Sequence, residues 1–160
     1  MRDQLRSQSD IFLSLVITFT TVLVDRATKI FFSGILDHGE SIPIIQNVFH
    51  LTLVHNTGIA FGLFKDYGIV FIVIPVIAIF LLIFNIYYYR HNNEFLDRIY
   101  IVAFSLILGG AIGNLIDRIR FGYVVDFLDF RIWPVFNVAD SAITIGAVII
   151  AVKCFQLSHK

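Results

Sequence analysis

The amino-acid sequence predicts a mainly α integral membrane protein with four transmembrane helices. Of the 160 residues, 58% are hydrophobic and only 15% are charged, and the mean hydropathy is +0.83. These values are too apolar for an ordinary soluble domain. The apolar residues also gather in four stretches, each close to the roughly 20 residues that a helix needs to cross a bilayer core. The length of the chain indicates a single membrane domain, 1–160.

The first predicted span is preceded by Arg2 and Arg6, as a cleaved signal peptide would be. No small-residue cleavage site follows it, so we interpret it as a retained helix. The second and third spans contain no charged residue at all. An even number of spans places both termini on the same side of the membrane. The four predicted spans are 11–32, 69–89, 99–116 and 137–156.

Counting basic residues does not decide the orientation, because six Lys and Arg lie on each side of the predicted membrane. The short loop at 90–98 is rich in polar residues and follows three tyrosines, 87–89, at an interfacial position. On the other side, most basic residues stand beside acids and are interpreted as their structural partners. We therefore expect both termini in the cytoplasm and the two longer connecting segments outside.

The outer segment between the first two spans predicts one or two short strands. Residues 40–65 are rich in β-branched and aromatic side chains that alternate loosely, with Gly58 at a turn or a close approach. In the other outer segment, 117–136, Trp133 and Pro134 come just before the last span. Trp is typical of a membrane–water interface, and Pro suits the entrance of a helix.

Polar residues gather at the predicted outer ends of the spans, where ionisable groups usually face the protein interior or a water-filled cavity. Two pairs stand four positions apart and so share a helix face. Salt bridges and interhelical hydrogen bonds explain these residues as well as a binding role does, and both interpretations stay open. Asp117 and Asp129, by contrast, are typical of solvated interfacial charges. The clustered residues are Asp25 and Lys29, Asn114 and Arg118, Asn137 at the start of the last span, and Asn56 in the strand segment.

Asp126 and Asp140 differ from these residues because neither has an obvious basic partner nearby. Asp126 lies in VVDF with only Arg131 within five positions, and Asp140 stands in the first turn of an apolar helix. Two carboxylates brought together in a low-dielectric site share a proton. One can then take a proton from water while the other polarises a peptide carbonyl, which is the chemistry of an aspartic peptidase. We expect the helix dipole to keep the negative charge on Asp140.

Other chemistries lack their sequence motifs. There is no HExxH and no Gly-x-Ser-x-Gly, and the lone Cys154 lies at the predicted cytoplasmic end. We expect no metal and no other cofactor, and the zero net charge gives no reason to expect a nucleic acid partner. A small proton- or cation-coupled transporter subunit is the main alternative, although the internal repeats typical of transporters are absent. A scaffold subunit is a further alternative, which the polar clusters disfavour.

Five motifs in order resemble the bacterial lipoprotein signal peptidase family, also called signal peptidase II. The resemblance covers nearly the whole chain. Each motif alone is weak, but five in order on four spans are specific. The motifs are DRATK (25–29), NTGIAFG (56–62), GGAIGNLIDR (109–118), VVDF (124–127) and FNVAD (136–140).

This resemblance implies a membrane aspartic endopeptidase of the bacterial cytoplasmic (inner) membrane. Its substrate would be a diacylglyceryl-modified prolipoprotein, cleaved just before the lipidated cysteine, and its active site would lie at the extracytoplasmic face. Asp126 and Asp140 match the catalytic residues of the family. The resemblance also implies a small outer β-sheet in 40–65 and a short external helix between the third and fourth spans. The residues matching supporting or substrate-binding positions are Asp25, Lys29, Asn56, Gly58, Asn114, Arg118 and Asn137.

The expected partners follow from the same resemblance. They are the prolipoprotein substrate, membrane lipid and inhibitors of the globomycin type. We expect the protein to be a monomer.

Overall fold

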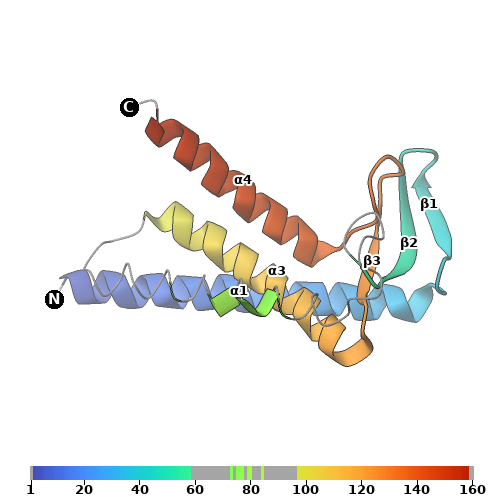
Figure 1. Ribbon diagram of the computed structural model, residues 1–160, viewed down its shortest axis with the longest axis horizontal. Helices are drawn as coiled ribbons and strands as arrows, with labels where there is room; N and C mark the ends of the chain where they lie inside the picture. The colour runs from blue at the N-terminus through green and yellow to red at the C-terminus, as the bar shows by residue number, and fades with distance from the viewer. Residues whose placement is uncertain are drawn as a thin grey trace.

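The computed structural model describes residues 2–58 and 97–158, together with Val73, residues 75–77, 79 and 80, and Phe84. Long helices run alongside one another, and a small sheet lies at the end opposite to the chain termini (Figure 1). The described positions within the second predicted span are helical, and the rest of that span lies outside the described residues. In chain order the elements are α1 (Arg2–Ile35), β1 (Ser41–Ile45), β2 (Phe49–Asn56), α3 (Arg98–Phe121), β3 (Val124–Asp129) and α4 (Val138–Ser158).

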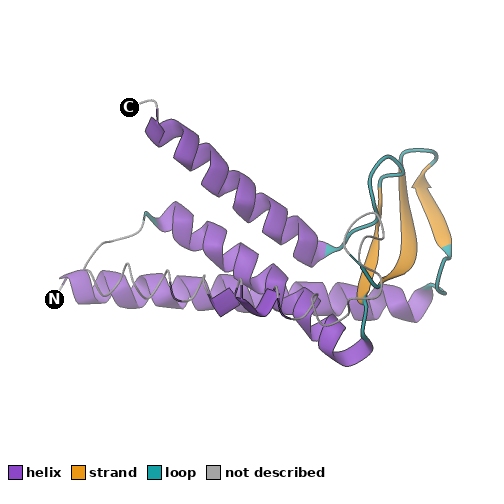
Figure 2. Cartoon of the chain, in the orientation of Figure 1, coloured by secondary structure: helices purple, strands orange, loops and turns teal. Residues whose placement is uncertain are grey.

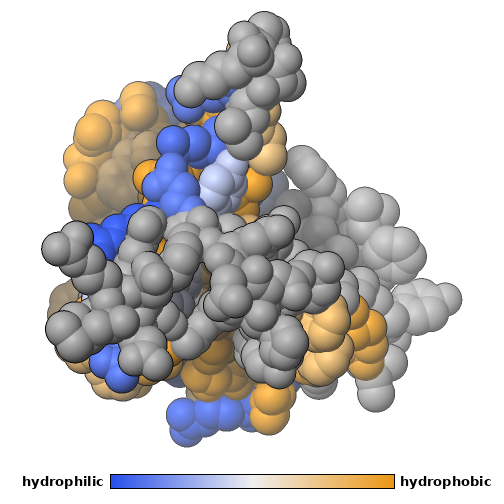
Figure 3. All heavy atoms as spheres, turned by 90° about the vertical axis from the view of Figure 1, so that its left-hand side faces the viewer, coloured by the Kyte–Doolittle hydropathy of each residue, from blue (hydrophilic) through white to orange (hydrophobic). Residues whose placement is uncertain are grey.

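Three helices in the described part of the chain are long and apolar enough to cross a membrane: Gln8–Ile35, Arg98–Phe121 and Val138–Gln156. Their apolar side chains are largely exposed, as Phe12 at 71% and Phe19 at 68% on α1 illustrate. Seen from the end where the termini lie, the coloured atoms include hydrophobic patches at the upper left and lower right (Figure 3). Such extensive exposed apolar surface suits contact with lipid. The predicted mainly α membrane fold is therefore confirmed.

Small residues allow α3 to pack closely against both α1 and α4. A Cβ atom at Gly146 of α4 would lie 2.6 Å from the carbonyl oxygen of Ala103 on α3. Gly110 of α3 faces the carbonyl oxygen of Ala139 in the same way. Any larger side chain would push the helices apart, and small residues are typical of such membrane helix contacts.

The three strands form one antiparallel sheet in the order β1-β2-β3 (Figure 2). Its third strand corrects one expectation, because residues 122–137, where the resemblance places a short external helix, form β3 and a loop instead. Gly122 ends α3 in the left-handed conformation, with φ 77°, and its N–H donates to the carbonyl oxygen of Arg118. The β-branched Val124 and Val125 that follow favour a strand.

The sheet rests on the outer end of α1. A small buried core lies between the sheet and the end of α1, formed by Leu36, Leu53 and Val125. Phe32 of α1 stacks on Phe127 of β3 with ring centroids 4.4 Å apart. This packing fixes β3, the strand that carries Asp126, against the first helix.

Candidate active site

The return of the chain from β3 to α4 brings Asp126 and Asp140 together. Leu128 and Phe136 exchange backbone hydrogen bonds: the N–H of Phe136 donates to Leu128 at 3.0 Å, and that of Leu128 to Phe136 at 2.8 Å. This pairing folds residues 130–135 out as a loop and starts α4 beside β3. Asp126 of β3 and Asp140 of the first turn of α4, from here the aspartate pair, therefore meet at the start of that helix.

Asn137 is hydrogen-bonded to both members of the aspartate pair. Its side-chain Nδ2 donates to Asp126 Oδ1 at 2.6 Å, and its backbone N–H donates to Asp140 Oδ2 at 3.2 Å. In return, the N–H of Asp140 donates to Asn137 Oδ1 at 2.9 Å. This reciprocal pattern is a capping box at the N-terminus of α4. One residue thus ends the loop, caps the helix and links the two carboxylates.

Two further amides complete the surroundings of the pair. Asn56 Nδ2 donates to Asp126 Oδ2 at 2.9 Å, and Asn114 Nδ2 donates to Asp140 Oδ1 at 2.8 Å. The N–H of Gly58 donates to Asn56 Oδ1 at 3.0 Å and so orients that amide. All four carboxylate oxygens therefore accept an N–H from an amide. Among the described residues, neither carboxylate forms an ion pair with Lys or Arg.

Burial determines the protonation of Asp126, whose exposed fraction is 1%. Burial, followed by the charge of Asp140, raises the pKa of Asp126 to about 7, although hydrogen bonds from Asn56 and Asn137 oppose this shift. Asp126 therefore keeps its proton up to about neutral pH. The half-buried guanidinium of Arg118 attracts both carboxylates electrostatically without forming an ion pair with either in the described part of the structure.

A second group of charges, the ion-pair cluster (Asp25, Arg26, Lys29 and Asp117), lies behind the aspartate pair. Lys29 Nζ is 2.9 Å from Asp25 Oδ2 and 2.9 Å from Asp117 Oδ2, and Arg26 pairs with Asp117 Oδ1. Lys29 also donates to Asn114 Oδ1 at 2.9 Å. Since Asn114 in turn donates to Asp140, the buried ammonium group orients an amide that contacts the aspartate pair.

The ion-pair cluster also holds the two elements that carry the aspartates. Asp25 Oδ1 accepts the N–H of Ala139 in the first turn of α4 at 3.0 Å, where the helix dipole favours a negative charge. Asp117 Oδ2 accepts the N–H of Val125 of β3 at 3.2 Å. Gly113 makes room for this arrangement, because a Cβ atom there would lie 2.6 Å from Asp25 Oδ2.

The predicted site residues thus converge on one region of the fold. Eight of them join through hydrogen bonds and ion pairs, and Arg118 attracts the pair through its charge. In the described part of the chain, no three His, Cys, Asp or Glu side chains gather to hold a metal ion. The converging residues are Asp25, Lys29, Asn56, Gly58, Asn114, Arg118, Asp126, Asn137 and Asp140.

The interpretation of Asp117 and Asp129 as solvated charges is wrong. Asp117 is fully buried at 0% exposure, and Asp129, 4% exposed, accepts hydrogen bonds from Thr52 and Arg131. The signal for Asp117 was its position three residues after Asn114, on the same face of α3. Its partner Arg26 stands 91 positions away, so sequence proximity could not reveal the pair.

Comparisons with known proteins show the family of this chain. Residues 17–156 match the family model described as signal peptidase (SPase) II. The lipoprotein signal peptidase of Halothermothrix orenii is 48% identical over 141 residues, which cover 88% of this chain and 94% of that protein. The lipoprotein signal peptidase of Moorella thermoacetica is 45% identical, with 89% of this chain and 91% of that protein covered.

A solved structure shares the fold as well. It is described as a bacterial membrane enzyme structure by the in meso method at 2.3 Å resolution. It matches with a TM-score of 0.81 and 32% sequence identity, covering 91% of this chain and 89% of that one. From the family match and these relatives, the chain belongs to the signal peptidase II family of lipoprotein signal peptidases.

Proposed function

We propose that this protein is a membrane aspartic endopeptidase that cleaves diacylglyceryl-modified prolipoproteins just before the lipidated cysteine and so releases the signal peptide. Membership of the signal peptidase II family supports a lipoprotein substrate and decides against the transporter interpretation. The observation that carries the catalytic part is the joint hydrogen bonding of Asp126 and Asp140 by Asn137. Two carboxylates held by one residue can share a proton.

In the proposed reaction, Asp126 is the protonated partner, since burial and the charge of Asp140 raise its pKa to about 7. Asp140, at the positive end of the α4 dipole, is the base. It takes a proton from water as the water oxygen attacks the scissile carbonyl carbon, while Asp126 gives its proton to the carbonyl oxygen. As the gem-diol collapses, Asp140 gives the proton that it took to the leaving nitrogen and the C–N bond breaks. Asp126 takes back a proton from one hydroxyl group of the gem-diol, so both carboxyl groups return to their starting states.

The surrounding residues have separate proposed roles. The side chain of Arg118 forms no hydrogen bond within the described residues, so its guanidinium group is available to bind a carbonyl oxygen of the substrate. Asn56, Asn114 and Asn137 hold the carboxylate oxygens, and Gly58 orients Asn56. Asp25 and Lys29 act through the elements they fix, without touching the reacting atoms.

The position of the aspartate pair fits a lipid-anchored substrate. The pair lies near the sheet end of the long helices, away from their middle (Figure 1). Acyl chains in the bilayer would hold the bond beside the lipidated cysteine at that level. With both termini in the cytoplasm, the site faces outward from the bacterial cytoplasmic membrane. The protein acts as a monomer, and globomycin-type inhibitors compete with the substrate there.

The test uses the purified full-length protein in detergent with a diacylglyceryl prolipoprotein and no added metal. The unaltered protein should release the signal peptide, whereas Asp126→Asn and Asp140→Asn should lower turnover by about 10⁴-fold or more, the scale seen when a catalytic group is removed. Gel mobility and mass spectrometry of the product identify the cleavage position.

Asp97→Asn is the matched control, because Asp97 is exposed and caps the far end of α3, and Asn caps a helix equally well. This variant should retain full turnover. Circular dichroism checks that each variant is folded. Normal turnover by a folded Asp126→Asn or Asp140→Asn variant would refute the proposed roles, as would cleavage at any other bond.

A further inference from the structure

A cavity of about 510 Å³ lies behind the strand that carries Asp126. Side chains of a strand alternate between its two faces. His55 and Val125 are cross-strand partners, and both line the cavity. Their chain neighbours Asn56 and Asp126 meet through a hydrogen bond on the opposite face. The cavity and the aspartate pair are therefore separate sites, placed back to back across a single layer of sheet.

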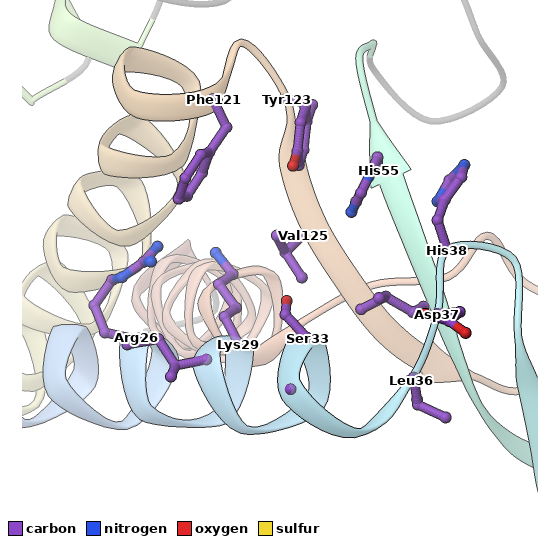
Figure 4. A pocket seen from close by; sticks show the side chains of 13 residues that line it. Arg26, Lys29, Ser33, Leu36, Asp37, His38, His55, Phe121, Tyr123 and Val125 are labelled. Atoms are coloured by element: carbon purple, nitrogen blue, oxygen red, sulfur yellow. The ribbon is translucent and has the colours of Figure 1, made fainter.

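Hydrogen-bond donors that have no partner in the described part of the chain surround this cavity. Within the described residues, Ser33, His38, His55 and Tyr123 make no side-chain hydrogen bond, although all four line the cavity. Figure 4 shows the hydroxyl groups of Ser33 and Tyr123 and the charged ends of Arg26 and Lys29 directed toward one shared space. Arg26 uses only Nη1 for Asp117, and its Nε and Nη2 hydrogens have no other acceptor among the residues that the structure describes.

The ring stack along the sheet fixes one wall of the cavity. His55 stacks on Tyr123 at 4.1 Å and on His38 at 4.4 Å. Burial, and then the neighbouring His38, lower the pKa of His55, which favours its neutral form. Among the described residues that line the cavity, Asp37 is the one acid. The interior thus presents donors in excess, an arrangement that suits a ligand rich in acceptor oxygens.

The cavity adjoins the lipid-facing side of α1. Ile30 lines it and is 65% exposed, and its neighbour Phe31 is 60% exposed. Gly34 also lines the cavity, and a Cβ atom there would meet nothing within 4 Å. A ligand can therefore have a polar head among the donors and an apolar part against the helix. Of the acceptor-rich groups at a membrane surface, the phosphate of a phospholipid matches both parts.

We propose that this cavity binds the phosphate group of a membrane phospholipid, with the acyl chains lying along the exposed side of α1. The phosphate oxygens accept hydrogen bonds from Arg26, Ser33 and Tyr123. This site is distinct from the proposed peptidase site, and it does not depend on the roles of Asp126 and Asp140.

Native mass spectrometry of the full-length protein in detergent tests this proposal, with dioleoylphosphatidylglycerol and dioleoylglycerol as probes. The unaltered protein should retain one phosphatidylglycerol and little dioleoylglycerol, which lacks the phosphate. Gly34→Leu, which fills the open space, should weaken phosphatidylglycerol retention about tenfold, equivalent to about 1.4 kcal/mol. Ala27→Leu adds bulk to α1 at an exposed position that does not line the cavity, and it should retain the lipid normally.

A second variant keeps the shape of the cavity and removes hydrogen-bond donors from its lining. Ser33→Ala combined with Tyr123→Phe deletes two hydroxyl donors and preserves the ring stack, and it should also weaken phosphatidylglycerol retention. Equal retention by the unaltered protein and Gly34→Leu, or equal retention of the two probes, would overturn the proposal. Displacement of the lipid by an equal concentration of glycerol 3-phosphate would overturn its lipid part and assign the cavity to soluble phosphate esters.

Discussion

The ion-pair cluster and the aspartate pair contain the same type of acid in neighbouring parts of one network, but they are neutralised differently. Asp25 and Asp117 each lie beside a buried or half-buried cation, and Lys29 is 2.9 Å from both. Within the described residues, the carboxylates of Asp126 and Asp140 accept hydrogen bonds from amide N–H groups and form no ion pair. The fold therefore supplies a permanent counter-charge in the cluster and leaves the pair to be balanced by a proton.

This difference suggests that the ion-pair cluster serves the stability of the fold and the aspartate pair serves its proposed activity. A carboxylate held by a fixed cation is poorly suited to exchange protons during a reaction. A carboxylate held by amides can gain or lose a proton without losing its position. We therefore expect substitutions in the ion-pair cluster to lower stability and substitutions around the aspartate pair to lower activity, and the following predictions test this division.

The largest effect on stability should come from Lys29→Met. Removing one partner of a buried ion pair leaves an uncompensated charge, at a cost of about 3–5 kcal/mol in the free energy of unfolding. Unfolding in mixed detergent and SDS micelles measures this cost. Lys153→Met is the control, because Lys153 pairs with the exposed Asp97 and such surface pairs contribute about 0–1 kcal/mol. Equal stability of the two variants would contradict the assigned role of the cluster.

Asn137→Ser separates helix capping from the support of the aspartate pair. Ser caps a helix about as well as Asn, so the cap of α4 should be kept. The lost amide bonds to Asn114 and to the carbonyl oxygen of Val125 should lower the free energy of unfolding by about 1–3 kcal/mol. However, Ser lacks the amide N–H that reaches Asp126 Oδ1. We expect turnover to fall about 10²-fold, as when one catalytic hydrogen-bond donor is lost. Steady-state kinetics on the prolipoprotein measures this, and unchanged kcat would show that the amide is dispensable.

Gly113→Ala should destabilise the protein by about 1–3 kcal/mol, the usual cost of overpacking. Its new methyl group would lie 2.6 Å from Asp25 Oδ2 and displace that carboxylate from Lys29. Gly34→Ala is the matched control on α1, where the added Cβ meets nothing within 4 Å. It should stabilise the helix by up to about 1 kcal/mol. Thermal unfolding of both variants checks the contrast.

The titration of Asp126 should give the most gradual effect, a change in the free energy of unfolding that is spread over several pH units. Because burial and the charge of Asp140 raise its pKa from 3.8 to about 7, the folded state binds more protons than the unfolded state between these values. Its contribution to stability is thus fully present below the unfolded value and declines as pH rises toward 7, by at most about 1.4 kcal/mol per pH unit. The slope should be shallower in Asp126→Asn. In the unaltered protein, kcat/KM should also fall above about pH 7 as the acid loses its proton.

The sequence predicted the helices better than the connections. The positions of the spans follow from hydropathy, which is a local property of the sequence. The first, third and fourth predicted spans are long apolar helices in the described part of the structure. The strand β3 escaped prediction because its partner β2 lies about 70 residues earlier in the chain, as the Asn56–Asp126 hydrogen bond illustrates. The aspartate pair was singled out because no cation stands near it in the sequence. The ion-pair partners of Asp117 could not be predicted, since both its cations come from α1, about 90 residues earlier.

The outer edge of β3 has a consequence for how a peptide approaches. Strands at the rim of a sheet normally offer free N–H and C=O groups to an incoming strand. Here the N–H of Val125 donates to Asp117, and the carbonyl oxygen of Val125 accepts a hydrogen bond from Asn137. The backbone N–H and carbonyl oxygen of Leu128 are both hydrogen-bonded to Phe136. Strand addition beside Asp126 is therefore closed. For the proposed peptidase we therefore expect an extended peptide to approach Asp126 across the face of the sheet, with its scissile bond over the strand.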